Sequence, residues 1–345
     1  METNEQIKKT KGKKIWGVTW RILCGVLVFL CTAVFAFVAV DRVRFHTFYK
    51  RAESTFAVPG IHSGYVPQGF DYDQEQGVFL ATGYMSDKTA SRVYVLDGKG
   101  GEYYTSLLDV DGSAYVGHTG GIVHNGDYVY ITGKSGLDVF PYQDILDGKP
   151  TVAKCGEIRS YLDPAYCYIA DGYLLTGSFY RVGNYETADY ERMTTPNGEQ
   201  NLAMMTVFKL DESAEFGVNP DPCAVISTRG LAQGMCITDS GKIVLSTSYA
   251  LAASKLYVYD SAKLQVEDGY TFAGETKDGV AFSCDGVTRV FLDGASHVDT
   301  IKAPCMSEEL VYLNGKIYIM NESACNLYIF GKLTSGRKIY AYPYA

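Results

Sequence analysis

Short apolar runs recur along the chain, each starting directly after a turn residue. Five of them align: GVFLATGY (77–84), GDYVYITGK (126–134), GYLLTGSFY (172–180), GKIVLSTSY (241–249) and GKIYIMNES (315–323). The residue before the glycine is Asn or Asp in three of the five runs. Asn-Gly and Asp-Gly are strong signals for two-residue hairpins, because type I′ turns need positive φ at both positions. Each run is therefore predicted to be the second strand of a repeated hairpin.

Three further elements complete each repeat. The first strand is predicted at five polar openings: PQGF at Pro67, GHTGGI at Gly117, PAYC at Pro164, AQGMC at Ala232 and PCMSEE at Pro304. The third strand is predicted at 91–97, 136–142, 206–211, 254–260 and 326–332. A weaker fourth strand is predicted at 102–110, 152–159, 222–228, within 268–303, and at 338–344. Four antiparallel strands per unit, at a period above 40 residues, are typical of β-propeller blades.

The spacing of the turn glycines sets the number of blades. The successive spacings are 49, 46, 69 and 74 residues, so the first two repeats are simple. The third contains a polar, Tyr-rich insert at 181–205, between its second and third strands. The fourth has an excess within 267–303, which fits either a long outer hairpin or a degenerate sixth blade. We predict an all-β propeller of five four-stranded blades over residues 65–345, with six blades as the alternative.

The two ends of such a ring must be joined, because an open edge strand invites aggregation. Residues 41–64 link the N-terminal segment to the first blade, and STFAV (54–58) is suited to be the closing outer strand of the last blade. The blade openings PQG (67–69), GHTGG (117–121), QGM (233–235) and MSE (306–308) resemble those of extracytoplasmic bacterial β-propellers of the NHL/YVTN-like kind. That resemblance covers about residues 65–345 and implies a secreted or membrane-anchored propeller without an assigned activity.

The N-terminus has a different pattern. A basic tail (1–14) precedes a long apolar segment at 15–40, and residues 22–40 contain no charged side chain. Nineteen residues at about 1.5 Å rise nearly cross a hydrocarbon core of about 30 Å. Trp16 and Trp20 suit one membrane interface, and the basic tail favours a cytoplasmic N-terminus. We predict a single-pass anchor in the cell membrane with an extracytoplasmic propeller. A cleaved signal peptide is the alternative, although the apolar core is longer than usual for one.

Charge separates the two parts of the chain. Residues 1–51 contain ten Lys and Arg against three Asp and Glu, whereas the remainder contains 21 basic and 36 acidic residues. Nucleic-acid phosphates require a basic face, so the acidic main part argues against a nucleic-acid partner. Seven of the nine cysteines lie beyond the apolar segment, and no CxxC pair points to zinc or redox chemistry.

The first residues of the five inner strands are predicted to meet at one mouth of the propeller channel. These candidate ligand-binding residues are Gln68, His118, Tyr166, Gln233 and Glu308. Glu308 is predicted to be the single channel carboxyl, with Glu309 on the opposite strand face. Gly69, Gly120, Gly121 and Gly234 would allow the inner strands to approach closely. Polar residues at this position also serve a purely structural role by binding channel water.

Two functions fit these residues. The favoured hypothesis is a binding or scaffolding module for a polar ligand, a glycan or an envelope protein. The alternative is a hydrolase or lyase that uses His118 as general base with Glu308 orienting it. Tyr84, Tyr180 and Tyr249, which follow second strands, are candidates for a glycan platform or for ordinary packing. No metal site or cofactor is predicted. The chain lacks HExxH, Walker and GxSxG motifs, and a channel calcium site, the alternative considered, would need more carboxylates than Glu308.

Overall fold

The computed structural model of the protein describes residues 2–344, and it describes no side chains for residues 1–15, 17 and 335. The basic tail predicted at 1–14 therefore falls outside the described side chains. The chain forms two compact units, residues 1–46 and 47–345. The first unit is one helix, α1 (Glu2–Arg44), in which Val18–Arg44 is long and apolar enough to cross a membrane.

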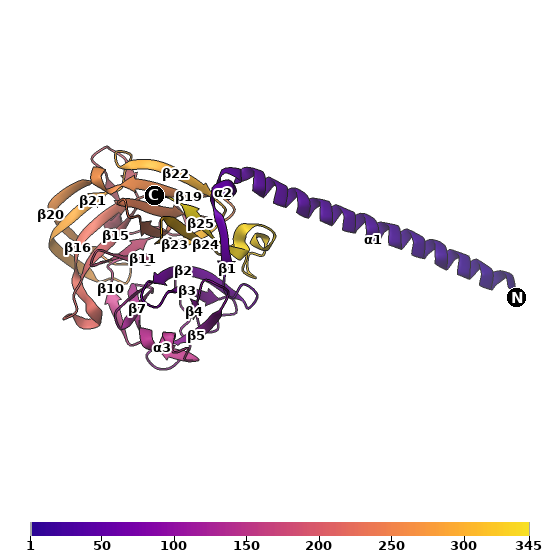
Figure 1. The fold of residues 1–345 in the computed structure, drawn as a ribbon, viewed down its shortest axis with the longest axis horizontal. Coiled ribbons are helices and arrows are strands. Elements are labelled where there is room, and N and C mark those ends of the chain that lie inside the picture. The colour runs from indigo at the N-terminus through magenta and orange to yellow at the C-terminus, as the bar shows by residue number, and fades with distance from the viewer. Residues whose placement is uncertain (1, 345) are drawn as a thin grey trace. The chain divides into compact units, whose positions relative to one another are not determined.

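The second unit begins with a short helix and a strand, α2 (His46–Arg51) and β1 (Glu53–Ala57), and continues into five blade sheets and one small two-stranded sheet (Figure 1). Blade one contains β2 (Tyr65–Asp73), β3 (Val78–Met85), β4 (Arg92–Leu96) and β5 (Glu102–Leu108). Blade two contains β6 (Ile122–Asn125), β7 (Tyr128–Thr132), β8 (Gly136–Pro141) and β10 (Gly156–Arg159), with α3 (Tyr142–Leu146) after β8. Blade three contains β11 (Pro164–Ala170), β12 (Tyr173–Ser178), β15 (Ala203–Leu210) and β16 (Val218–Thr228). Blade four contains β17 (Ala232–Ile237), β18 (Lys242–Thr247), β19 (Ser254–Asp260) and β22 (His297–Ala303).

Blade five closes the ring. It contains β23 (Ser307–Leu313), β24 (Lys316–Asn321) and β25 (Lys338–Pro343), and its outer strand is β1 from the other end of the chain. The innermost strands neighbour one another in a closed circle, with β2 beside β6, β6 beside β11, β11 beside β17, β17 beside β23, and β23 beside β2. The chain is therefore a five-bladed β-propeller, and the six-bladed alternative is wrong.

The excess within 267–303 is mostly a long hairpin. Strands β20 (Gln265–Glu275) and β21 (Ala281–Phe291) pair with each other, and β21 adds in parallel to the outer strand β16 of blade three. The insert of blade three lies between β12 and β15, as predicted, and holds a two-stranded sheet of β13 (Met193–Thr194) and β14 (Gln200–Asn201). Single 3-10 turns lie at η1 (Asp189–Glu191), η2 (Glu215–Gly217) and η3 (Ser261–Lys263).

Two predicted strands differ from the structure. Residues 326–332 are not the third strand of blade five, because they belong to a loop that contains η4 (Phe330–Leu333) and η5 (Ser335–Arg337). Strand β25 takes the third position, since β1 already fills the fourth. The strand predicted at 152–159 is divided. Its first part, β9 (Thr151–Ala153), adds to blade one beside β5, and only β10 belongs to blade two.

The hairpin turns explain the repeated glycine signal. At Asp171-Gly172 the φ angles are 49° and 81°, and at Asn314-Gly315 they are 51° and 74°. Both residues of each turn are left-handed, which is the type I′ geometry expected from the sequence. Glycine and Asn or Asp tolerate this conformation best, so the sequence and the turn agree locally.

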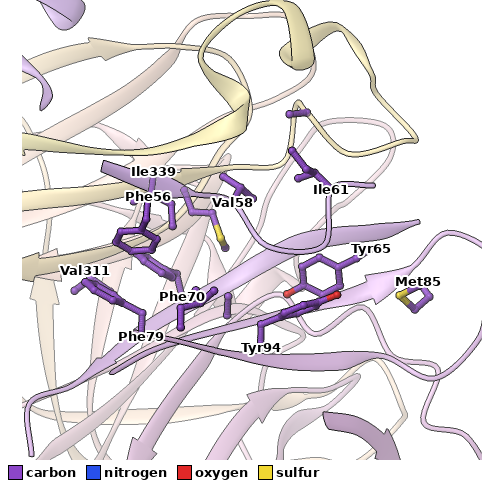
Figure 2. Packing of buried hydrophobic residues seen from close by; sticks show 14 residues of the cluster. Phe56, Val58, Ile61, Tyr65, Phe70, Phe79, Met85, Tyr94, Val311 and Ile339 are labelled. Atoms are coloured by element: carbon purple, nitrogen blue, oxygen red, sulfur yellow. The ribbon is translucent and has the colours of Figure 1, made fainter. Parts of the chain in front are cut away.

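A hydrophobic cluster seals the junction between blades five and one (Figure 2). Phe56 of β1 packs against Phe79 of β3 with ring centroids 4.9 Å apart, and Phe70 stacks on the same ring at 5.3 Å. Val311 and Ile339 contribute from blade five. Since β1 comes from the start of the unit and β25 from its end, burial of Phe56 joins both ends of the ring.

A single carboxyl group ties the inner strands together at the channel axis. Glu309 of β23 is 1% exposed and accepts backbone N–H groups from Phe70 at 2.8 Å, Ile122 at 3.1 Å and Cys167 at 3.1 Å. It thus joins blade five to blades one, two and three. The prediction that Glu309 lies away from the channel is wrong, because a register shift between Ser307 and Leu310 interrupts the simple alternation of β23.

Close approach of the inner strands makes this arrangement possible. A Cβ atom added to Gly121 would lie 2.6 Å from the Cys167 nitrogen, and one added to Gly234 would lie 2.4 Å from the Glu309 Cα. Any side chain there would push neighbouring blades apart. The glycines of the blade openings therefore serve packing at the axis, as the sequence predicted.

Replacing Phe56 by Ala should destabilise segment 47–345 by about 3 kcal/mol, because the change leaves a cavity under the closing strand. Ser54→Ala at an exposed position of the same strand is the matched control, and it should change stability by less than about 0.5 kcal/mol. Urea unfolding measures both. Equal midpoints for the two variants would show that β1 does not seal the ring.

Replacing Glu309 by Ala should cost at least about 3 kcal/mol, because three buried N–H groups lose their acceptor at about 1 kcal/mol or more each. Glu309→Gln keeps one carbonyl acceptor and should lose less. Chemical denaturation of both variants in segment 47–345 gives the comparison. If both substitutions lowered the free energy of unfolding by the same small amount, the three hydrogen bonds would not be stabilising the ring.

Candidate functional site

The channel mouth is the face on which the inner strands begin and the second strands end. Gln68 lies near the start of β2, and Glu308 near the start of β23. Glu322 follows the end of β24 directly, and Tyr84 is next to the last residue of β3. These positions bring side chains from blades one and five to the same face.

A pair of carboxyl groups is the main feature of this mouth. Glu308 is 1% exposed, and its Oε1 has no hydrogen-bond partner among the described residues. Burial raises the pKa of Glu308 well above its ordinary value, and the neighbouring Glu322 raises it further. Burial also raises the pKa of Glu322, to about 7. Burial therefore favours the protonated form of both carboxyl groups relative to an exposed glutamate.

Gln68 fixes one member of the pair. Its Nε2 donates to Glu322 Oε2 at 2.8 Å and also to the carbonyl of Pro67 at 2.9 Å. The amide is buried, with only 3% of the residue exposed, so this donor is held in a fixed place. Gln68 therefore orients Glu322 while the Oε1 of Glu308 is left without a partner.

Aromatic rings surround the carboxyl pair. The phenol groups of Tyr84 and Tyr328 interact with each other, and the charge of Glu322 raises the pKa of both. The His118 ring stacks on Tyr84 with centroids 5.2 Å apart and an interplanar angle of 27°. Although part of His118 reaches solvent, the protein around its ring lowers its pKa, so the imidazole is neutral at pH 7.

A polar groove of about 840 Å³ adjoins His118 beside blade two. Its lining mixes acidic and basic side chains, namely Asp109, Asp138, Glu157 and Asp278 with Lys134, Lys154 and Arg159. Lys154 already binds Asp138 at 3.1 Å and Glu157 at 2.5 Å. His118 lines this groove and also stacks on Tyr84, so the groove and the carboxyl pair are adjacent parts of one face.

The other predicted residues have different surroundings. Tyr166 is completely buried, and its hydroxyl lies near Thr228 of blade three. Gln233 is half-buried at the start of β17. The two residues predicted as a catalytic pair have different neighbours. Acidic groups act on Glu308, whereas the His118 ring packs on Tyr84. The structure thus brings Gln68 and Glu308 to the same carboxyl partner, Glu322.

Glu322 and Tyr328 were not anticipated from the sequence. Glu322 follows a second strand, the same kind of position that drew attention to Tyr84, Tyr180 and Tyr249. Applying the same alignment of second strands to the fifth repeat would have identified Glu322 from the sequence. Tyr328 could not have been found in this way, because its segment was expected to be a strand.

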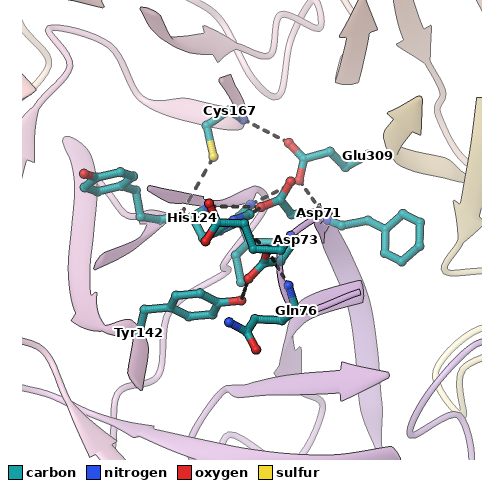
Figure 3. Close-up of polar contacts among 11 residues, drawn as sticks. Asp71, Asp73, Gln76, His124, Tyr142, Cys167 and Glu309 are labelled. Atoms are coloured by element: carbon teal, nitrogen blue, oxygen red, sulfur yellow. Dashed lines mark hydrogen bonds and ion pairs between the residues drawn. The ribbon is translucent and has the colours of Figure 1, made fainter. Parts of the chain in front are cut away.

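A second polar network lies deeper, between blades one and two (Figure 3). Asp71 Oδ2 accepts from the backbone N–H of His124 at 2.9 Å and lies 2.7 Å from its Nδ1. Asp73 lies 3.6 Å from the Nε2 of His124 and accepts the Tyr142 hydroxyl at 2.5 Å. Burial acts to lower the pKa of His124, but the hydrogen bond and charge of Asp71 outweigh it and raise the pKa. Among residues 2–344, no group of three or more His, Cys, Asp or Glu side chains is arranged to hold a metal ion.

The comparisons with known proteins concern the fold. No protein-family model matches the chain, and no curated protein sequence matches it. The PQQ-bound aldose sugar dehydrogenase of Streptomyces coelicolor is 13% identical, with a TM-score of 0.40, over 84% of this chain and 95% of that chain. BamB of Moraxella catarrhalis is 11% identical, with a TM-score of 0.32, over 81% and 83% of the two chains. The Pan2 WD40 domain of Neurospora crassa is 11% identical, with a TM-score of 0.33, over 79% of each chain. The propeller assignment rests on the strand pairing of this chain.

His124 should make stability depend on pH. A histidine whose pKa is raised by folding contributes stability that is complete below its unfolded pKa of about 6.5 and is lost as pH rises through the folded value. Segment 47–345 should therefore lose stability above about pH 6.5 relative to His124→Asn, which keeps the backbone N–H bond to Asp71. Urea unfolding at steps from pH 5 to 9 measures this. Parallel curves for the two proteins would exclude a protonated His124.

Proposed function

We propose that the chain is a membrane-anchored binding module whose propeller mouth binds a polar ligand or the surface of a protein partner. Helix α1 would hold the module in the bilayer, with the basic N-terminus in the cytoplasm and the propeller outside it. The apolar stretch Val18–Arg44 supports an anchor, and the excess of basic residues before it supports this orientation.

The observation that carries the proposal is the exposure of large apolar side chains on the mouth face. They lie in the β5–β6 connection and in the loops between the second and third strands of blades three, four and five. We name this set the apolar rim: Val110, Val116, Val182, Tyr185, Leu251, Leu327, Ile329 and Leu333, exposed by 46% to 71%. Apolar residues gathered on one face are typical of surfaces that another molecule covers.

The polar site and the apolar rim complement each other. A partner covering the rim would bury apolar surface, at roughly 25 cal/mol per Å², and would place its own polar groups near Glu308 and Glu322. Some rings at this face are already occupied by the protein itself. The guanidinium carbon of Arg192 lies 5.4 Å from the ring centroid of Tyr180, and that of Arg181 lies 3.9 Å from the ring centroid of Tyr249. These contacts leave less of the two ring faces for a glycan.

A thermal-shift panel of glycans and peptides on segment 47–345 tests the proposal. We expect at least one compound to raise the melting temperature, since a ligand at 100 times its Kd stabilises the folded state by about 2.7 kcal/mol. Tyr84→Ala should abolish that shift, and Ile329→Ser should weaken it for peptides. Tyr173→Ala and Val298→Ser, exposed residues outside the mouth loops, are the matched controls. A panel without any shift, or shifts retained in Tyr84→Ala, would contradict binding at the mouth.

A further inference from the structure

We propose that the mouth binds a primary ammonium group between Glu308 and Glu322, supplied by a small amine or by a lysine side chain of a partner. This inference rests on the proposed binding function and names the chemistry of what is bound. Tyr84, Tyr328 and His118 would form the walls around the ammonium group.

The first support is an unmet hydrogen-bonding need. A buried polar atom without a partner costs about 1–3 kcal/mol, and a buried charge costs more. Glu308 is 1% exposed, and its Oε1 has no partner among the described residues. The charge of Glu322 acts on it, and the side-chain donor recorded for Glu322 in the described structure is the Gln68 amide. An ammonium group has three N–H donors and one positive charge, so it would satisfy the unpaired oxygen and both carboxyl groups together.

The second support is the absence of an internal counter-charge in this part of the described structure. The titratable groups that act on Glu308 are Glu322, Glu309 and Cys325, and none of them is a base. Lys332 acts on the Cys325 thiol and donates to Asn326, but it is not among the groups that act on Glu308. Elsewhere on this face the protein supplies its own cations, as Arg181 does over Tyr249 and Arg229 over Tyr257. The ring of Tyr84 instead carries the neutral ring of His118.

The walls suit a cation. Electron-rich ring faces within about 6 Å attract an ammonium group, and carboxyl groups behind them add a direct charge interaction. The titratable groups that face the pair are Tyr84, Tyr328, Cys325, His118 and Glu309. The pKa of each tyrosine and of Cys325 is raised, and that of His118 is lowered. Burial raises the pKa of Glu309, and its three N–H donors lower that pKa by a smaller amount. Glu322 is therefore the group that gives up a proton around pH 7.

Binding is then an exchange of one cation for another. The ammonium group enters with its three protons, and the proton of Glu322 leaves to solvent, so the net charge of the site does not change. Because that proton must leave, affinity should rise with pH by about tenfold between pH 6 and pH 8 for a carboxyl group whose pKa is about 7.

Isothermal titration with segment 47–345 tests the inference. The probes are Nα-acetyl-lysine methylamide, its neutral counterpart Nα-acetyl-norleucine methylamide, and a short lysine-containing peptide with apolar neighbours. We expect the two lysine probes to bind, the norleucine probe not to bind, and up to one proton to be released per amine. Glu322→Gln and Glu308→Gln should each weaken amine binding at least tenfold without lowering the melting temperature. Glu212→Gln, which removes an equal charge from an exposed bottom-face turn, should bind as the unmodified chain does.

Each outcome decides between the alternatives. Equal binding of lysine and norleucine probes, or unchanged binding in both Gln variants, would overturn the ammonium site. If no amine bound while another ligand still lost its thermal shift in Tyr84→Ala, the ammonium inference would fail and the binding function would stand. If amines bound and Ile329→Ser weakened only the peptide, the source would be a partner's lysine. Equal effects on peptide and small amine would indicate a free amine.

Discussion

The Glu309 carboxyl group is the interaction on which the ring depends. One side chain from blade five accepts N–H groups from the inner strands of blades one, two and three, in a place that water barely reaches. Inner strands of a propeller leave edge N–H groups pointing at the axis, and these need acceptors. Glycines such as Gly121 and Gly234 bring the strands near enough for a single carboxyl group to serve three blades. The three hydrogen bonds to Glu309 therefore depend on the close packing of the inner strands.

This central contact also places the candidate site. Glu309 and Glu308 are neighbours on β23, so anchoring the first at the axis holds the second at the mouth. Glu308 then lies beside Glu322 of the next strand end, in surroundings that raise the pKa of both groups. The acidic groups of the site lie on or next to strands of the ring, whereas Tyr328 and part of the apolar rim come from the loop of blade five.

The closing strand shows how stability and function are distributed. Phe56 of β1 seals blade five against blade one, the same two blades that form the carboxyl pair. The segment predicted as a third strand at 326–332 is free to form the mouth loop because β25 and β1 complete the sheet without it. The deeper network of His124 with Asp71 and Asp73 joins blade one to blade two and takes no direct part in the mouth.

The sequence by itself determined the repeat, the turn chemistry and the apolar N-terminal segment, because each depends on local spacing. It favoured five blades over six, and the pairing of β20 and β21 with blade three decided the number. Glycine turns and strand alternation involve only a few consecutive residues, so they can be recognised in the sequence without knowledge of the fold. It also led to Gln68 and Glu308. Only the tertiary structure decided that Glu309 faces the axis, that Glu322 is the partner of Glu308, and that β25 pairs with β1. These depend on a strand irregularity and on contacts between segments up to about 290 residues apart, which no local pattern encodes.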